Sequence, residues 1–174
     1  MNLPNTLTVL RILMIPFFVI TLTYGKYALS LTLFIAAALT DALDGFIARI
    51  QNKKTAIGKF LDPLADKALV LTSFIIFAIL GWIPKWLAIT VISRDVIIVV
   101  GSAILYIVTG NLKVSPSLIG KATTFSQLFL AALLLLLVNL NSLKALPSVI
   151  IWITGILTIA SGIQYIYRGF RIAS

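Results

Sequence analysis

The chain has 174 residues, of which 60% are hydrophobic and only 11% are charged, with a net charge of +9. This composition excludes an ordinary soluble globular domain and indicates a single-domain integral membrane protein over residues 1–174. The chain contains neither cysteine nor histidine, which excludes disulfides, thiolate sites, the usual zinc sites and imidazole bases. Acid or base chemistry therefore falls to the five acidic residues, all of which are aspartates.

Apolar stretches of about 20 residues, the length that spans a bilayer, recur along the whole chain. We predict spans at 7–24, 28–50, 59–80, 84–109, 117–139 and 147–168. The breaks between them carry turn-forming or polar residues and fall at Gly25, the QNKK run (51–54), 81–84, 110–116 and 141–147. The expected fold is an all-α integral membrane protein, a six-transmembrane-helix bundle with both termini on one side of the membrane.

Basic residues are shared unequally between the two ends of these spans. The end that holds both termini carries Arg49, Lys53, Lys54, Lys59, Lys113, Lys121, Arg168 and Arg171, and the other end carries Lys26, Lys85 and Lys144. By the positive-inside rule the richer end, with both termini, is cytoplasmic. We therefore expect a multi-pass membrane protein with this end in the cytoplasm. We also expect a bacterial inner membrane as its location, membrane lipids and phosphorylated substrates as its partners, and no nucleic acid.

Four of the five aspartates lie in one stretch, residues 40–67, which reads TDALDGFIARIQNKKTAIGKFLDPLADK. An unpaired carboxylate within a membrane costs at least roughly 2.5 kcal/mol. Asp41 and Asp44 are three residues apart, and Asp62 and Asp66 are four apart, so on two helices each pair would share a face. Two such faces turned toward each other would form an oxygen-rich site suited to a pair of Mg²⁺ or Mn²⁺ ions.

The second aspartate pair falls in the first turns of the predicted span 59–80. Pro63 is tolerated there because the first N–H groups of a helix have no partner within the helix. A helix N-terminus also favours anions. We therefore expect Asp62 and Asp66 to stay ionised and available to metal.

Other polar positions leave two interpretations open. Asn5, Thr8 and Arg11 at the start of the first span form either a ligand-binding motif or a helix start with a snorkelling arginine. Arg94, beside Asp95 and deep in the fourth span, forms either a local ion pair or a site for an anionic group. Further along, Lys121, Thr124 and Gln127 follow one side of the fifth span, whereas the sixth is expected to be apolar as far as Gln164.

The central stretch resembles the signature of the CDP-alcohol phosphatidyltransferase family. It reads Asp41-x2-Asp44-Gly45-x2-Ala48-Arg49-x8-Gly58-x3-Asp62-x3-Asp66, which is similar to that signature at every fixed position, eight identities over 26 positions. The resemblance extends over essentially the whole chain. It implies a six-helix bundle, usually a homodimer, that moves a phosphatidyl group from a CDP-linked lipid to an alcohol and releases CMP.

The resemblance also implies roles for individual residues. Asp41, Asp44 and Asp62 would hold one of two divalent ions, Mg²⁺ or Mn²⁺, and Asp66 would help to hold the second. Two such ions can stabilise the attacking and leaving oxygens of a pyrophosphate. The CDP-lipid site would be lined by Asn5, Thr8, Gly45, Ala48, Arg49 and Gly58. With no histidine in the chain, Asp66 is the expected general base for the acceptor hydroxyl.

Similarity to one branch of the family indicates which alcohol accepts the phosphatidyl group. The stretches PNTLTVLR, TAIGKFLDPLADK and IGKATTFSQ most resemble the phosphatidylglycerophosphate synthases, a branch of the family that uses CDP-diacylglycerol and sn-glycerol 3-phosphate. The phosphate of that acceptor needs cations, for which we expect Lys59, Arg94 and Lys121. The alternative is a cardiolipin synthase, which uses phosphatidylglycerol and shares the ISRDV-like stretch at residues 92–96.

Two functions of other classes are also compatible with intramembrane aspartates. A divalent-cation or proton transporter would need acidic groups along a whole pathway, but here the carboxylates lie near one membrane face. A scaffold with a structural metal would leave Arg49, Arg94 and Lys121 without a role. The sequence therefore favours the enzyme.

Overall fold

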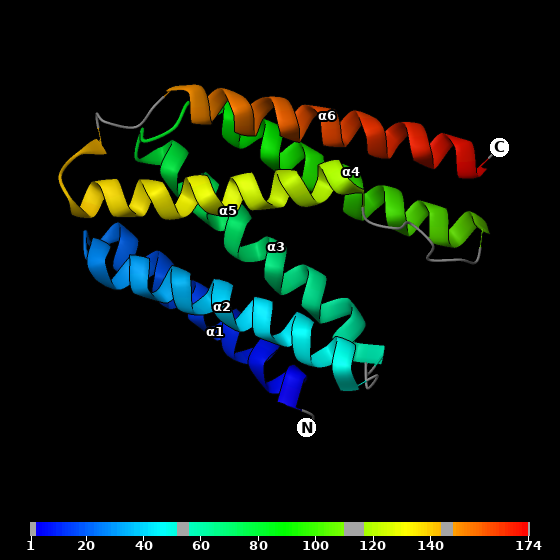
Figure 1. Ribbon diagram of the computed structural model, residues 1–174, viewed down its shortest axis with the longest axis horizontal. Coiled ribbons are helices and arrows are strands. Elements are labelled where there is room, and N and C mark those ends of the chain that lie inside the picture. Colours follow the sequence, from blue (N-terminus) through cyan, green and yellow to red (C-terminus); the bar gives the residue numbers. More distant parts are fainter. Residues whose placement is uncertain (1–2, 52–55, 110–116, 144–147, 174) are drawn as a thin grey trace. The chain divides into compact units, whose positions relative to one another are not determined.

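The protein is described by a computed structural model that covers residues 3–51, 56–109, 117–143 and 148–173, with side chains for 9–40, 67–104, 107, 117–143 and 148–169. Across these ranges the chain forms six α-helices: α1 Leu3–Thr23, α2 Tyr27–Gln51, α3 Ala56–Ile79, α4 Lys85–Thr109, α5 Leu118–Asn139 and α6 Ser148–Ala173 (Figure 1). The all-helical prediction is confirmed. Compared with the predicted spans, the largest differences in helix bounds are the earlier start of α1 and the later end of α6.

Three stretches of the described chain are long and apolar enough to cross a membrane: Lys85–Ile104 in α4, Leu118–Asn139 in α5 and Ser148–Gly169 in α6. Shorter apolar stretches occur in the other helices, at Val9–Thr23, Tyr27–Thr40 and Lys67–Ile79. Helices α1, α2 and α3, which contain these shorter stretches, each continue into residues whose side chains are not described. The membrane character of the second half is thus supported directly, and the count of six spans stays a prediction.

Helices α1, α3 and α5 end in the same way: two positions after the last helical residue, each is followed by a residue with a positive φ. Gly25, Gly81 and Asn141 have φ values of 73°, 73° and 52°. In each case this residue donates its N–H to the carbonyl three residues back, and the next residue donates to the carbonyl five residues back. This Schellman arrangement satisfies carbonyls that the helix end leaves open, and glycine and asparagine tolerate the required conformation. The predicted breaks at these positions are confirmed, whereas 52–55 and 110–116 lie outside the described residues.

The chain divides into two compact units, the first of which comprises Met1–Ile76 and Ala131–Ala145. In this unit α1 packs along α2 (Figure 1). The rings of Phe18 and Phe34 lie 5.9 Å apart between the two helices. Nearby, Ser30 Oγ donates a 3.0 Å hydrogen bond to Thr21 Oγ1, and both side chains are buried. Ring packing and one satisfied polar contact therefore join this helix pair.

The second unit comprises Phe77–Leu130 and Leu146–Ser174. Here α4 and α6 run side by side (Figure 1). The rings of Trp86 and Trp152 lie 5.1 Å apart, and a Cβ atom added at Gly155 would be 2.7 Å from the Trp86 ring. The absence of a side chain at Gly155 thus lets α6 approach the tryptophan on α4, as small residues do at close helix contacts in membranes.

Candidate active site

The aspartate window, which we define as residues 41–66, lies on α2 and α3. Asp41 and Asp44 fall within α2, and Asp62 and Asp66 fall within α3. The helical backbone gives each pair the expected spacing along one face, while the four side chains lie outside the described residues. Helix α3 begins at Ala56, three residues earlier than predicted, so Asp62 lies beyond its first turn. Because the field of a helix end falls off within that turn, its contribution to keeping these carboxylates ionised is small.

The residues predicted to bind the CDP-lipid, and one predicted acceptor cation, also lie on these first helices. Their side chains fall outside the described residues, so their roles stay predictions; they are Asn5, Thr8, Gly45, Ala48, Arg49, Gly58 and Lys59. Arg11, the next polar residue of the first motif, is described and is only 1% exposed. A snorkelling arginine keeps its charged head in water, so the snorkelling interpretation is wrong for Arg11.

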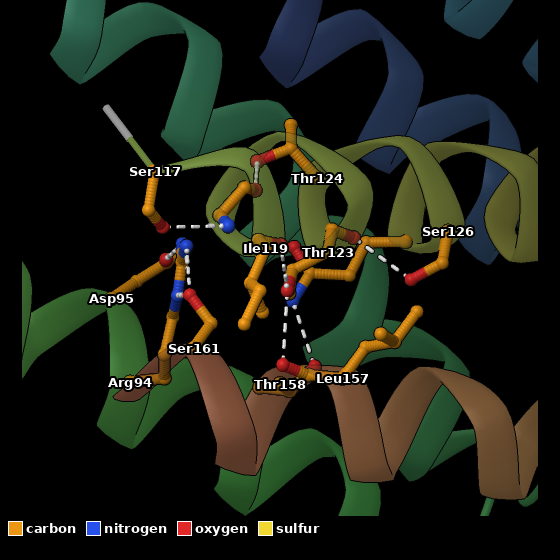
Figure 2. A network of polar contacts seen from close by, with 12 residues as sticks. Arg94, Asp95, Ser117, Ile119, Thr123, Thr124, Ser126, Leu157, Thr158 and Ser161 are labelled. Carbon is orange, nitrogen blue, oxygen red and sulfur yellow. Dashed lines mark hydrogen bonds and ion pairs between the residues drawn. The ribbon is translucent and has the colours of Figure 1, made fainter. Parts of the chain in front are cut away.

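Residues of α4, α6 and the start of α5 surround the guanidinium of Arg94, and we call them the Arg94 cluster: Arg94, Asp95, Ser117, Gly120 and Ser161. Arg94 is 6% exposed and Asp95 is 2% exposed. Arg94 Nη1 donates to Asp95 Oδ1 at 2.6 Å. The local ion pair that the sequence allowed is therefore present (Figure 2). It lies within a helix segment apolar enough to span a membrane, where charged groups are rare and usually functional.

Ser161 on α6 completes the contacts of the guanidinium. Arg94 Nε and Nη2 both donate to Ser161 Oγ, at 3.2 Å and 2.8 Å, and Figure 2 shows the hydroxyl facing the guanidinium from the neighbouring helix. The two residues are 67 positions apart in the chain. One hydroxyl of α6 and one carboxylate of α4 thus hold three nitrogens of Arg94.

The start of α5 lies against the same guanidinium. Ser117 caps this helix, because its Oγ accepts a 2.9 Å hydrogen bond from the backbone N–H of Gly120. A Cβ atom added at Gly120 would lie 3.5 Å from Arg94 Nη2. Lys121 follows directly in the chain, and its side chain is exposed. The structure therefore brings two of the three predicted acceptor cations to the same helix start, without showing a contact between their side chains.

The predicted polar side of α5 is divided in the structure. Lys121 is exposed, whereas Gln127 is buried and its Nε2 donates to Thr158 Oγ1 on α6 at 3.2 Å. The other buried polar contact to α6 comes from Thr123, whose Oγ1 donates to the Leu157 carbonyl at 2.9 Å. These contacts, drawn in Figure 2, join α5 to α6. Gln127 therefore serves helix packing.

Sequence reasoning missed the polar face of α6. Thr154, Thr158 and Ser161 are all buried, although this helix was expected to be apolar as far as Gln164. Their spacings of four and three residues place them on one face. The signal was available in the sequence, but single hydroxyl residues in an apolar helix are ambiguous because they can bond to their own backbone, as Thr158 also does with the Thr154 carbonyl at 2.6 Å.

A cavity of about 390 Å³ lies at the turn between α1 and α2 and is lined by Gly25, Lys26, Tyr27, Ala28, Leu29, Val138, Asn139 and Asn141. Asp41 is 14 residues further along α2 than Tyr27, a distance of about 21 Å at 1.5 Å per residue. The Tyr27 end of this cavity is therefore well separated from Asp41 along α2.

Comparison with known proteins shows which sequences this chain resembles. The sequence model described as CDP-alcohol phosphatidyltransferase matches residues 1–160. The chain is 35% identical to the CDP-diacylglycerol–glycerol-3-phosphate 3-phosphatidyltransferase of Bacillus subtilis (strain 168), with 98% of this chain and 96% of the relative covered.

Two further relatives carry the same name. The protein of Aquifex aeolicus (strain VF5) is 31% identical, with 99% of this chain and 98% of the relative covered. That of Escherichia coli (strain K12) is 34% identical, with 95% and 93% covered. The similarity therefore extends over nearly the full length of all three relatives.

Proposed function

The chain belongs to the CDP-alcohol phosphatidyltransferase family, and on this premise we propose that it transfers a phosphatidyl group from CDP-diacylglycerol to sn-glycerol 3-phosphate, giving phosphatidylglycerophosphate and CMP. The observation that carries the proposal is the aspartate signature at fixed spacing on two helices. It occurs in a chain that matches relatives named for this reaction over nearly their whole length. The reaction is a step of phospholipid biosynthesis.

The carboxylates of the aspartate window fit a pair of hard divalent ions. Asp41, Asp44 and Asp62 would hold one Mg²⁺ or Mn²⁺, and Asp66 would help to hold the second, because such ions prefer carboxylate oxygens. The helical backbone at both aspartate pairs, which puts each pair on one face, supports this assignment. When bound, the ions would neutralise the charge that develops on the pyrophosphate oxygens.

The remaining residues of the first three helices bind and orient the donor lipid. Asn5, Thr8, Gly45, Ala48, Arg49 and Gly58 would line the CDP-diacylglycerol site. Asp66 takes the proton from the acceptor hydroxyl. The hydroxyl oxygen then forms a bond to the β-phosphorus of CDP-diacylglycerol, the bond from that phosphorus to the bridging oxygen breaks, and CMP leaves with the electron pair.

The acceptor phosphate is held by three cations, two of which lie outside the aspartate window. We assign this role to Arg94 and Lys121, with Lys59 as a third group. Two observations support the assignment. Arg94 is buried within an apolar helix, and it lies against the first turn of α5, the turn that contains Lys121. An arginine guanidinium can bind two phosphate oxygens at once.

The same proposal includes the membrane arrangement. The chain would form one domain with six spans, both termini and the active site at the cytoplasmic face of a bacterial inner membrane, and it would act as a homodimer. The excess of lysine and arginine at the end of the spans that holds both termini supports this orientation. Large apolar side chains exposed on α4 and α6 support contact with lipid or a second copy; they include Ile89, Val96, Ile104, Ile156 and Ile163.

An acceptor panel tests the proposed function. Purified protein in detergent would be given labelled CDP-diacylglycerol with glycerol 3-phosphate, phosphatidylglycerol, serine or inositol phosphate, and the lipid product would be identified. We expect phosphatidylglycerophosphate from glycerol 3-phosphate and little product from the others. Conversion of phosphatidylglycerol in place of glycerol 3-phosphate would instead show a cardiolipin synthase, the alternative that the ISRDV-like stretch leaves open.

A further inference from the structure

We propose that Ser161 is a positioning residue: its hydroxyl fixes the orientation in which the Arg94 guanidinium receives the phosphate of the acceptor. The inference rests on the proposed acceptor role of Arg94 and adds a residue that is distant in the sequence from the aspartate signature. It starts from an unusual contact. One buried oxygen, Ser161 Oγ, accepts from both Nε and Nη2 of the same arginine, at 3.2 Å and 2.8 Å.

This contact restrains the plane of the guanidinium. The five N–H donors of arginine lie in one plane in a fixed fork, so two bonds to a single oxygen define the edge that faces α6. The hydrogen bond from Nη1 to Asp95 Oδ1, at 2.6 Å, restrains the guanidinium at a second nitrogen. With both contacts made, rotation about the end of the side chain would break at least one of them. The orientation is thus set by residues on two helices.

The contacts leave donors for a ligand. Among the described residues, Nε, Nη1 and Nη2 of Arg94 each make one hydrogen bond to Asp95 or Ser161. Nη1 and Nη2 carry two N–H groups each, so one N–H on each terminal nitrogen is left over. Two donors on the terminal nitrogens are the number that a bidentate phosphate contact needs.

Gly120 places no side chain beside Nη2. A Cβ atom at this position would lie 3.5 Å from Nη2 and 3.1 Å from Ser117 Oγ, where it would occupy the room next to the guanidinium. The nearby N-terminus of α5 contributes partial positive charge. An incoming phosphate at this position would therefore meet an oriented arginine without competition from a side chain at residue 120.

The alternative role for Ser161 is to join α4 to α6. Thr158, one turn earlier on α6, provides the matched comparison, because it is also fully buried and its hydroxyl also takes part in an interhelical hydrogen bond, from Gln127. Loss of either hydroxyl removes a contact between helices. Only loss of the Ser161 hydroxyl releases Arg94. The two roles therefore predict different kinetics.

The test compares Ser161→Ala, Ser161→Thr and Thr158→Val in the purified full-length protein. For Ser161→Ala we expect the apparent KM for glycerol 3-phosphate to rise about tenfold, which corresponds to about 1.4 kcal/mol, with kcat and the KM for CDP-diacylglycerol within about twofold of wild type. Ser161→Thr keeps the hydroxyl and should restore acceptor affinity. Thr158→Val should leave both KM values unchanged. Thermal unfolding in detergent verifies that each variant is folded.

The outcomes separate this inference from the proposed function. If Arg94→Lys raises the KM for glycerol 3-phosphate but Ser161→Ala does not, the positioning role is overturned and the acceptor role of Arg94 stands. If neither Arg94→Lys nor Lys121→Ala affects that KM, the acceptor assignment falls and the role of Ser161 falls with it. Equal changes in both substrate KM values, or a threonine variant as impaired as the alanine variant, would show that Ser161 acts only through packing.

Discussion

The aspartate window and the Arg94 cluster differ in how their residues are distributed along the chain. The window is a run of 26 positions whose spacing alone indicates chemistry. The cluster brings together residues of α4, α5 and α6, with Arg94 and Ser161 67 positions apart. The first can be recognised without a structure. The second becomes visible only when three helices are placed side by side. Sequence spacing therefore finds the proposed reacting groups more readily than the groups proposed to orient a substrate.

This difference predicts two kinds of functional defect. Changes in the aspartate window should reduce the rate of phosphatidyl transfer, because these residues are assigned to metal ions and proton transfer. Changes in the Arg94 cluster should weaken acceptor binding and spare the donor lipid. This distinction would be contradicted if changes in the aspartate window weakened only acceptor binding, or if changes in the Arg94 cluster also weakened binding of the donor lipid.

The largest effect is expected for the metal ligands. Asp41→Asn, Asp44→Asn and Asp62→Asn should each remove nearly all phosphatidyltransferase activity while the protein stays folded, because each loses one anionic ligand without opening a cavity. Activity within about tenfold of wild type, only about 1.4 kcal/mol in barrier terms, would contradict the assignment. Thr40→Val is the matched control, since its hydroxyl bonds to the carbonyls of its own helix.

Asp66→Asn should separate binding from turnover. If Asp66 acts chiefly as the general base, the variant should still bind CDP-diacylglycerol in the presence of divalent metal, yet turn over slowly, by a factor of about 10² to 10⁴. Equilibrium binding of the CDP-lipid and single-turnover rates measure the two quantities. A loss of binding in proportion to the loss of rate would identify Asp66 as a metal ligand only.

The acceptor cations should show the opposite pattern. Arg94→Ala or Lys121→Ala should raise the apparent KM for glycerol 3-phosphate by about 10- to 100-fold, because a charge-assisted hydrogen bond contributes roughly 1.5 to 3 kcal/mol. The KM for CDP-diacylglycerol should hardly change. Arg94→Ala also removes the ion-pair partner of buried Asp95, which is destabilising, so Arg94→Lys and a thermal unfolding measurement accompany it.

The smallest functional effect, but a clear loss of stability, is expected at the contact between α4 and α6. Gly155→Ala would place a Cβ atom 2.7 Å from the Trp86 ring, and such overpacking costs about 1–3 kcal/mol. Gly162→Ala is the control, because its nearest contact would be an ordinary 3.6 Å. We expect a lower unfolding temperature in detergent for Gly155→Ala alone. Equal unfolding temperatures would show that this contact adapts readily.

Much of the fold followed from sequence because its signals are local. Glycine or asparagine at the turns, with about 20 apolar residues between them, predicted helices whose ends the Schellman contacts at Gly25, Gly81 and Asn141 confirm. The start of α3 was placed three residues late because Gly58, a poor helix former, was taken as the residue that opens the helix, whereas the helix includes it. Helix propensity decides such boundaries weakly.

The site was predictable only where its chemistry is local. Arg94 and Asp95 are neighbours in the sequence, so their ion pair was predicted as one of two possibilities. The contact with Ser161 was not, because a serine in an apolar helix most often bonds to its own backbone. Similarly, steps of three residues through Thr124 grouped Lys121 with Gln127, whereas the structure exposes Lys121 and buries Gln127 against α6.

Metal-dependent, acceptor-dependent release of CMP tests the central claim most directly. Purified protein would be freed of divalent ions with EDTA and supplied with CDP-diacylglycerol and labelled glycerol 3-phosphate, and CMP and labelled lipid would be measured as Mg²⁺ or Mn²⁺ is restored. The account predicts no turnover without the ion and, with it, one CMP released for each labelled phosphatidylglycerophosphate formed. A full rate in EDTA, or CMP release that does not depend on glycerol 3-phosphate, would contradict it.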